Sequence, residues 1–323
     1  MDTLVRFEKT YTSPAENLEG LTGRGLLIKD REFAERNLSR IGYYRLSAYW
    51  YPFRKFEDST PNSKRLDEFR TGAEFADVME FYLFDKKLRL HLSDALERIE
   101  IAVRAQLVDV MCQIGPFSYR DSRSYTASFI NKIDGQPPLI DPFIDGLDEA
   151  FERSKEEFAK HFKSKYEGPP PVWIAAGTWD WGNLSYMLGY LSEKNRDAIC
   201  RAIDPRLTRK SLASWMKCLN DVRNACAHHS RLWNKPLINS PRLKPKEIDE
   251  FKCLLDERGR VPDANSKRLY GALVVMIFLM RCFYPKTEWQ VRLRKLIMNS
   301  KHPAEVNPLT AGFPENWHQA DIW

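Results

Sequence analysis

The chain lacks the features of a secreted or zinc-binding protein. Its six cysteines are scattered through 323 residues and include no Cys-x-x-Cys pair. Zinc ribbons need such pairs, and disulfide frameworks are typical of secreted chains. The first residues, Met-Asp-Thr-Leu-Val-Arg, contain no apolar segment of the kind found in signal peptides. We therefore expect a cytoplasmic protein with reduced thiols.

Long apolar runs and nucleotide-binding motifs are also missing. The longest apolar run, residues 272–280, is too short to span a bilayer and predicts a buried helix rather than a membrane anchor. No glycine-rich loop of the Walker or dinucleotide type occurs. Nor do strands alternate with helices, as they would in a nucleotide-binding sheet. We expect no cofactor and no membrane contact.

Apolar residues at helical spacing run through most of the chain and predict an all-α fold. Asp30 is the expected N-cap of an early helix. The longest helical region covers residues 73–112, as one helix or with one break, and residues 266–284 predict an apolar helix. Residues 57–72 are polar and turn-rich and predict a domain boundary or a loop. We expect an N-terminal aromatic-rich helical extension over residues 1–70, a helical core with C-terminal helical additions over 71–300, and an irregular tail over 301–323.

Residues 43–53 are unusually rich in aromatic side chains, with Arg45 among them. Such a segment can stack on nucleic-acid bases. It can also dock a helix onto the protein core through its rings, which is the more common arrangement and the one that we favour.

Residues 221–234 concentrate an arginine, an asparagine and two adjacent histidines in a predicted helix over about residues 208–233. On a helical wheel, His229 lies within roughly 50° of the centre of the apolar stripe, and His228 lies about 150° away. We therefore expect His228 to point into solvent and His229 to sit at the edge of the core. The apolar stripe consists of Leu212, Trp215, Leu219, Val222 and Cys226.

Arg223, Asn224 and His228 suit the cleavage of RNA. A histidine transfers protons near neutral pH, and an arginine stabilises negative charge on phosphate oxygens. RNA supplies its own nucleophile in the 2′-hydroxyl. The plain alternative is a polar helix face whose histidine caps a neighbour or contacts water.

Positive charge is concentrated around this segment. Residues 171–240 contain ten Lys and Arg against five Asp and Glu, within a chain of formal net charge +6. The excess fits an anionic partner such as RNA, and a solvated surface with a chance asymmetry would give the same count. Within the RNA-binding interpretation, we expect Arg45, Arg98 and Arg231 to contact RNA.

Two acid–base pairs lie one helical turn apart in the long helical region. Asp94 precedes Arg98, and Glu100 precedes Arg104. Both fit surface ion pairs that contribute only a few tenths of a kcal/mol each. Alternatively, Glu100 or Arg104 contacts the face that carries Arg223 and orients it.

Four candidate ligands near the motif, Cys218, Cys226, His228 and His229, do not favour a metal site. Cys226 lies on the buried stripe and His228 on the opposite face, so one ion could not easily reach both. The chain also contains a single Arg-x4-His motif, since His91, His161, His302 and His318 have no arginine five to seven positions earlier. A site that needs two motifs must therefore come from a homodimer.

Two segments stand out as a pair: Ile41-Gly-Tyr-Tyr-Arg-Leu-Ser-Ala-Tyr-Trp-Tyr-Pro-Phe53 and Val222-Arg-Asn-Ala-Cys-Ala-His-His-Ser-Arg-Leu-Trp-Asn234. Between them lie residues 88–107, with Leu96-Glu-Arg-Ile-Glu100 and Arg104. Together they resemble the Abi-like, or abortive-infection, family of bacterial phage-defence proteins. The likeness covers roughly residues 20–285, and its second segment is fairly specific.

The resemblance implies a HEPN-like helical bundle, whose ribonuclease members use an Arg-x4–6-His motif, often with asparagine after the arginine. Arg223, Asn224 and His228 match this pattern, and His229 also falls within the permitted spacing. Such ribonucleases are generally metal-independent and bring two motifs together across a dimer. Some family members are associated with a structured small RNA.

The resulting hypothesis is a metal-independent endoribonuclease that acts as an RNA-targeting toxin in phage defence and leaves 2′,3′-cyclic phosphate ends. One alternative is a non-catalytic protein that holds a small structured RNA. Another is a helical interaction protein whose aromatic segment docks a protein partner.

Overall fold

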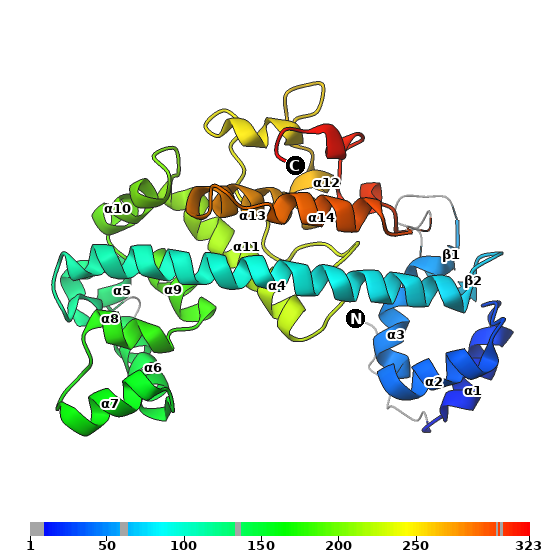
Figure 1. Cartoon of the computed structure of the whole chain (residues 1–323), viewed down its shortest axis with the longest axis horizontal. Coiled ribbons are helices and arrows are strands. Elements are labelled where there is room, and N and C mark those ends of the chain that lie inside the picture. The colour runs from blue at the N-terminus through cyan, green and yellow to red at the C-terminus, as the bar shows by residue number, and fades with distance from the viewer. Residues whose placement is uncertain (1–9, 59–63, 133–136, 302, 304–305) are drawn as a thin grey trace. The chain divides into compact units, whose positions relative to one another are not determined.

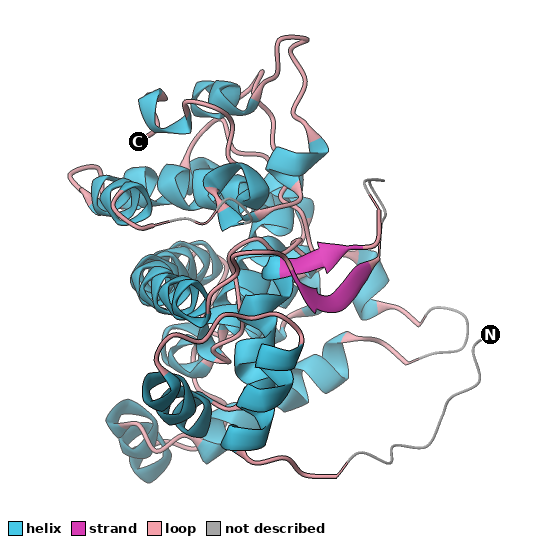
Figure 2. Ribbon diagram, turned by 90° about the vertical axis from the view of Figure 1, so that its right-hand side faces the viewer, coloured by secondary structure: helices cyan, strands magenta, loops and turns pink. Residues whose placement is uncertain are grey.

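The structure is a computed structural model that describes residues 10–58, 64–132, 137–301, 303 and 306–323. Helices dominate these residues, which confirms the expected all-α class, and one two-stranded sheet accompanies them (Figures 1 and 2). The HEPN-like arrangement of the helices stays a prediction. Residues 1–9, where no signal peptide was expected, and His302 lie outside the described residues.

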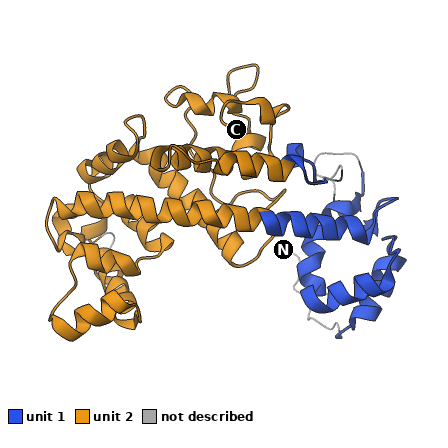
Figure 3. Cartoon of the chain, viewed as in Figure 1, with its two compact units in different colours: residues 1–87, 298–310 blue, residues 88–297, 311–323 orange. Residues whose placement is uncertain are grey.

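The chain divides into two compact units (Figure 3). The N-terminal unit comprises residues 1–87 and 298–310, and the C-terminal unit comprises residues 88–297 and 311–323. The long helix α4 (Phe75–Cys112) contributes to both units and is continuous over its 38 residues. The domain boundaries expected near residues 70 and 300 stay predictions.

Three short helices precede α4 in the N-terminal unit: α1 (Pro14–Gly23), α2 (Arg31–Ile41) and α3 (Tyr43–Trp50). Asp30 accepts a hydrogen bond from the backbone N–H of Phe33, which confirms it as the N-cap of α2. Gly42 separates α2 from α3 with a φ of 91°, a backbone conformation that favours glycine.

The aromatic segment mainly serves packing within its own unit. Tyr49, Trp50 and Phe53 are buried, the last in a 3-10 turn over Tyr51–Phe53. The Tyr49 hydroxyl donates to the buried carboxylate of Asp85 on α4 at 2.8 Å. These contacts fit the docking interpretation of the segment. Tyr44, however, leaves 79% of its surface exposed.

A short antiparallel hairpin pairs β1 (Arg54–Phe56) with β2 (Arg65–Phe69). Strand β2 lies in the stretch that was predicted to be a loop, and that prediction was wrong. The strands are too short and too polar to show an alternating pattern in the sequence. Arg65 stabilises the hairpin by donating to the carbonyl oxygens of Pro52 and Arg54 at 2.8 and 2.7 Å.

The C-terminal unit is built around the second part of α4. The side chains predicted to form its inner face are buried, as the helical period requires: Leu92, Leu96, Ile99, Val103, Leu107 and Val110. The other helices of this unit are α5 (Ala127–Ile130), α6 (Ile140–Arg153), α7 (Glu157–Lys165), α8 (Val172–Ala175), α9 (Trp181–Tyr190), α10 (Glu193–Ile203), α11 (Arg209–Ala227), α12 (Asp263–Ser266), α13 (Leu269–Phe283) and α14 (Trp289–Met298).

Helix α11 lies at the centre of the C-terminal unit and contacts α9, α10 and α13. The Trp181 indole N–H of α9 donates to the carbonyl oxygen of Met216 at 2.8 Å. Helix α13 corresponds to the apolar helix predicted over residues 266–284, and every residue from Leu269 to Met280 is buried. A helix that is apolar on all sides is stable in water only when other elements bury it.

The last residues of the chain are irregular apart from short 3-10 turns, as expected, and they are well packed. Phe313, Trp317 and Trp323 gather with Tyr270 of α13 in one aromatic cluster. Over the part of the chain that is described, no helix combines the length and the apolar character needed to cross a membrane.

Candidate active site at the end of helix α11

Helix α11 begins where the sequence predicts and ends earlier. The Thr208 hydroxyl caps its N-terminus by accepting from the Ser211 N–H. At the other end, the His229 N–H donates to the Cys226 carbonyl at 3.1 Å, and the Ser230 N–H donates to the Ala225 carbonyl at 2.9 Å. This pair of bonds is a Schellman motif, and it ends the helix at Ala227 rather than near residue 233.

The two histidines therefore lie beyond the helix and not on its wheel. His228 is the C-cap residue, and its N–H donates to the Asn224 carbonyl at 2.9 Å. Its side chain is exposed, as predicted. His229 was predicted to sit at the edge of the core, and this was wrong, because it is also exposed.

The error has a local cause in the backbone. His229 adopts a φ of 55°, in the left-handed region that turns the chain away from the helix axis. Glycine is the usual residue at this position, and its absence concealed the helix end in the sequence. Histidine is one of the few other residue types enriched there.

Arg223 and Asn224 remain on the last turns of α11. Both are half-buried, and an Nη1–H of Arg223 donates to Asn224 Oδ1 at 3.3 Å. The asparagine thus holds the guanidinium from one side, while its backbone carbonyl holds His228. Asn224 therefore connects Arg223 with His228.

Glu100 and Arg104 form an ion pair on α4, and Glu100 lies within electrostatic range of Arg223 on α11. Arg104 Nη2 lies 2.6 Å from Glu100 Oε1 and 2.8 Å from the carbonyl oxygen of Trp179. Burial raises the pKa of Glu100, and the positive charges of Arg104 and Arg223 oppose that rise. The electrostatic coupling places Arg223 in the neighbourhood of the Glu100–Arg104 pair.

Asp180 completes this charged group, although no sequence pattern marks it as a site residue. Its side chain caps α9 by accepting from the Asn183 N–H at 2.8 Å. Its charge adds to the rise in the pKa of Glu100, so it lies near the same carboxylate. An aspartate before an apolar helical stretch is a recognisable N-cap signal, but that signal says nothing about proximity to α4. We call Glu100, Arg104, Asp180 and Arg223 the charged cluster.

The three arginines expected to contact RNA are not part of this cluster. The guanidinium of Arg98 lies 4.2 Å from the centroid of the Tyr284 ring and 3.8 Å from Asp94. Two residues along a helix correspond to about 200°, so Arg98 and Glu100 occupy different faces of α4. Arg231 is half-buried after the helix end, and Arg45 is exposed on α3 in the N-terminal unit.

The cysteines near the motif are buried and separate from the exposed histidines. Cys218 and Cys226 lie on the inner face of α11. Burial raises the pKa of the Cys218 thiol, which disfavours the thiolate that metals and electrophiles require. Among the described residues, no group of three His, Cys, Asp or Glu side chains is arranged to hold a metal ion.

Comparison with known proteins identifies one family. A family model described as Abi-like protein matches residues 36–234, a span that includes the charged cluster and both histidines. No curated protein and no solved structure matches the chain. Since the matched span is well over half of the sequence, the chain belongs to the Abi-like protein family.

Proposed function

We propose that this protein is a metal-independent endoribonuclease of the HEPN type, which acts in the cytoplasm as an RNA-targeting toxin. Membership of the Abi-like family suggests a role in abortive-infection defence against phage. The end of α11 supports the finer assignment, because it combines an exposed imidazole with a held guanidinium five residues earlier.

In the proposed reaction, the 2′-hydroxyl of a ribose attacks the adjacent phosphorus. A bond forms between O2′ and phosphorus, and the bond from phosphorus to the O5′ of the next nucleotide breaks. His228 takes the proton from the 2′-hydroxyl or delivers one to the departing O5′. The products are a 2′,3′-cyclic phosphate and a 5′-hydroxyl.

Arg223 stabilises the negative charge that develops on the phosphate oxygens in this reaction. Its fork matches phosphate geometry, and Asn224 holds that fork from one side. Glu100 supports it through the charged cluster, where Arg104 in turn anchors Glu100 to the Trp179 carbonyl. A guanidinium that is already oriented loses less entropy when the substrate arrives.

One imidazole cannot serve as base and acid at the same instant. The chain carries a single Arg-x4-His motif, so a second His228 from another copy would supply the other role. We therefore propose a homodimer with a composite site. One His228 would then remove the proton from the 2′-hydroxyl while the other donates a proton to O5′.

The observation that supports the proposal most is the exposure of His228 at a fixed helix end. The test is an RNA cleavage assay in EDTA with the full chain, with His228→Ala, and with His161→Ala as a matched control. His161 is another exposed histidine, on α7. We expect the control to cleave like the wild type and His228→Ala to be inactive at equal purity.

Each contrary outcome identifies a different error. Full activity of His228→Ala would remove the residue from the mechanism. Cleavage that stops in EDTA would contradict the metal-independent reaction. RNA binding without cleavage by the wild type would favour a non-catalytic protein that holds a small RNA.

A further inference from the structure

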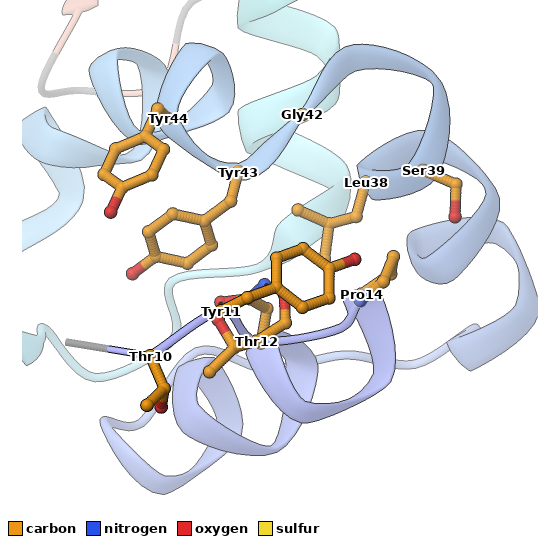
Figure 4. A pocket seen from close by; sticks show the side chains of 10 residues that line it. Thr10, Tyr11, Thr12, Pro14, Leu38, Ser39, Gly42, Tyr43 and Tyr44 are labelled. Atoms are coloured by element: carbon orange, nitrogen blue, oxygen red, sulfur yellow. Dashed lines mark hydrogen bonds between the residues drawn. The ribbon is translucent and has the colours of Figure 1, made fainter.

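A cavity of about 730 Å³ opens in the N-terminal unit (Figure 4). It lies where the segment before α1 meets the turn between α2 and α3. Its volume is in the range of small-molecule sites. The lining residues are Thr10, Tyr11, Thr12, Pro14, Asn17, Leu38, Ser39, Gly42, Tyr43 and Tyr44.

Three tyrosine rings line this cavity: Figure 4 shows Tyr43 and Tyr44 directly after the turn at Gly42, and Tyr11 on the segment before α1. Tyr11 and Tyr44 are 87% and 79% exposed, although each carries a large ring. The rings of Tyr43 and Tyr44 meet edge to face, with centroids 5.6 Å apart and planes at 85°. Two perpendicular rings form a corner in which a planar group can stack on one and contact the edge of the other.

Tyr43 is held in place from two sides. Its hydroxyl accepts a hydrogen bond from Arg24 Nη2 at 2.8 Å, and its ring lies 5.0 Å from that of the buried Trp50. The opposite wall is fixed by two bonds between Thr12 and Asn17, at 3.0 and 3.1 Å. The Tyr43 ring and the Thr12–Asn17 wall are therefore in place before any ligand arrives.

The chemistry of the lining selects a neutral ligand with polar edges. None of the ten lining residues is charged, so the cavity is unsuited to binding a free phosphate ion. Hydroxyl groups and one side-chain amide line it instead, and these can donate and accept hydrogen bonds. A planar ring with donors and acceptors on its rim, such as a nucleobase, satisfies both the rings and the polar groups.

Two exposed arginines are direct sequence neighbours of lining residues on α2 and α3. Arg45 follows Tyr44 on α3 and is exposed, and Arg40 is exposed near the end of α2. Alternation of aromatic and cationic side chains is the pattern of surfaces that bind single-stranded nucleic acid, where bases stack and phosphates meet the cations. A base in the cavity would bring its phosphate toward these arginines.

We infer that the cavity binds one unstacked base of a single-stranded RNA. The inference rests on the proposed function for its ligand class. It assigns the N-terminal unit a part in RNA recognition that does not require the chemistry at α11. Tyr11 and Tyr44 are the stacking residues, and Arg45 contacts the neighbouring phosphate.

The experiment uses the full chain in the His228→Ala background, so that RNA stays intact during the measurement. The probe is a short unstructured RNA of mixed sequence that contains 4-thiouridine and a fluorescent end label. Affinity is measured by fluorescence anisotropy for Tyr11→Ala, Tyr44→Ala and Tyr44→Trp. Tyr166→Ala is the matched control, since Tyr166 is a half-exposed tyrosine of the C-terminal unit.

We expect Tyr11→Ala and Tyr44→Ala each to weaken binding on the order of ten-fold, the usual effect of losing one base–aromatic stack. Tyr44→Trp should keep the affinity, and the control should not change it. Photo-crosslinking should attach the 4-thiouridine to peptides that contain Tyr11 or Tyr43 and Tyr44. Because Tyr11 and Tyr44 are exposed, their truncation does not disturb the core.

Three results would overturn the inference. The first is unchanged affinity in both alanine variants with crosslinks only elsewhere in the chain. The second is binding of free adenosine or uridine that depends on Tyr11 and Tyr44, while the affinity for RNA is the same in all variants. The ligand of the cavity would then be a free nucleoside. The third is no RNA binding at all, which would also remove the RNA-holding alternative.

The two proposals fail separately in this design. If the wild type cleaves RNA and the tyrosine variants bind RNA normally, the cavity is not a base site and the ribonuclease proposal stands. If the wild type never cleaves RNA and binding depends on Tyr11 and Tyr44, the base site stands and the ribonuclease proposal falls.

Discussion

His229 donates its backbone N–H to the carbonyl oxygen of Cys226 at 3.1 Å, and together with the bond from Ser230 this contact ends α11. The buried cysteine belongs to the core, and the histidine three residues later is already in solvent. The helix end therefore separates the buried part of the motif from the exposed histidines. Arg223 and Asn224 stay on the helix, and His228 sits at its cap.

The left-handed conformation of His229 predicts that glycine there stabilises the protein. A side chain in this region of backbone space costs roughly 1–2 kcal/mol, and glycine avoids that cost while adding entropy to the unfolded chain. We expect His229→Gly to raise the free energy of unfolding by about 0.5–1 kcal/mol. Denaturant titration of the two proteins measures the difference.

Ala227→Gly provides the control for that change, because Ala227 is the last helical residue and is exposed. Glycine there should lower the free energy of unfolding, by at most about 1 kcal/mol. If His229→Gly is as destabilising as Ala227→Gly, the Schellman motif does not end the helix as described.

Arg223→Lys should lose most cleavage while the fold persists. Lysine keeps the charge but lacks the planar fork that Asn224 holds. We expect the single-turnover rate constant to fall about 100-fold, as when one aligned donor to the transition state is removed. Arg201→Lys, an exposed arginine on α10, is the control and should cleave normally. Equal rates in both variants would show that the geometry of Arg223 is unimportant.

The raised pKa of Glu100 predicts a pH dependence of stability. Folding favours its protonated form, mainly because of burial. Below the ordinary value of 4.5, both states hold the proton and there is no penalty. As pH rises through and above 4.5, the unfolded chain ionises first, so the folded state loses stability until the folded carboxyl ionises as well.

Glu100→Gln removes this titration. The free energy of unfolding of Glu100→Gln should therefore increase relative to that of the wild type as pH rises from about 4 to 7. Chemical denaturation at several pH values checks this, with the exposed Glu97→Gln on the same helix as control. A difference between wild type and Glu100→Gln that stays constant with pH would contradict the assignment.

His91 should destabilise the protein in mild acid. Its ring stacks on Trp289 with centroids 5.1 Å apart, and its Nε2 lies 3.1 Å from the Trp289 carbonyl oxygen. Burial lowers the pKa of His91 below its ordinary 6.5, so folding favours the neutral ring. As pH falls below 6.5, the unfolded chain gains the proton first, and stability declines.

His91→Phe keeps an aromatic ring against Trp289 and removes the titration. We expect the wild type to lose more unfolding free energy than His91→Phe between pH 7.5 and 5.5, as measured by urea denaturation. His161→Phe changes an exposed histidine and should behave like the wild type. Parallel losses in wild type and His91→Phe would show that the half-buried His91 ring does not control the effect.

The helical elements of the site were predictable from the sequence. The inner faces of α4 and α11, the start of α11 near Thr208, the N-cap at Asp30 and the apolar α13 all follow from spacing and end signals. The exposure of His228 was predicted as well, although the predicted helix continued past it. These features depend on residues within a few positions of one another.

The sequence by itself determined the all-α class, the buried stripes and the grouping of Arg223, Asn224 and His228, because helical periodicity is a property of neighbouring residues. Tertiary structure decided where α11 ends, which carboxylate lies within electrostatic range of Arg223 and how three tyrosines come to line one cavity. Each of these depends on groups that are far apart in the chain, or on a backbone conformation that side-chain spacing does not encode. Asp180 shows the difference, since its capping role is local and its place beside Glu100 comes only from packing.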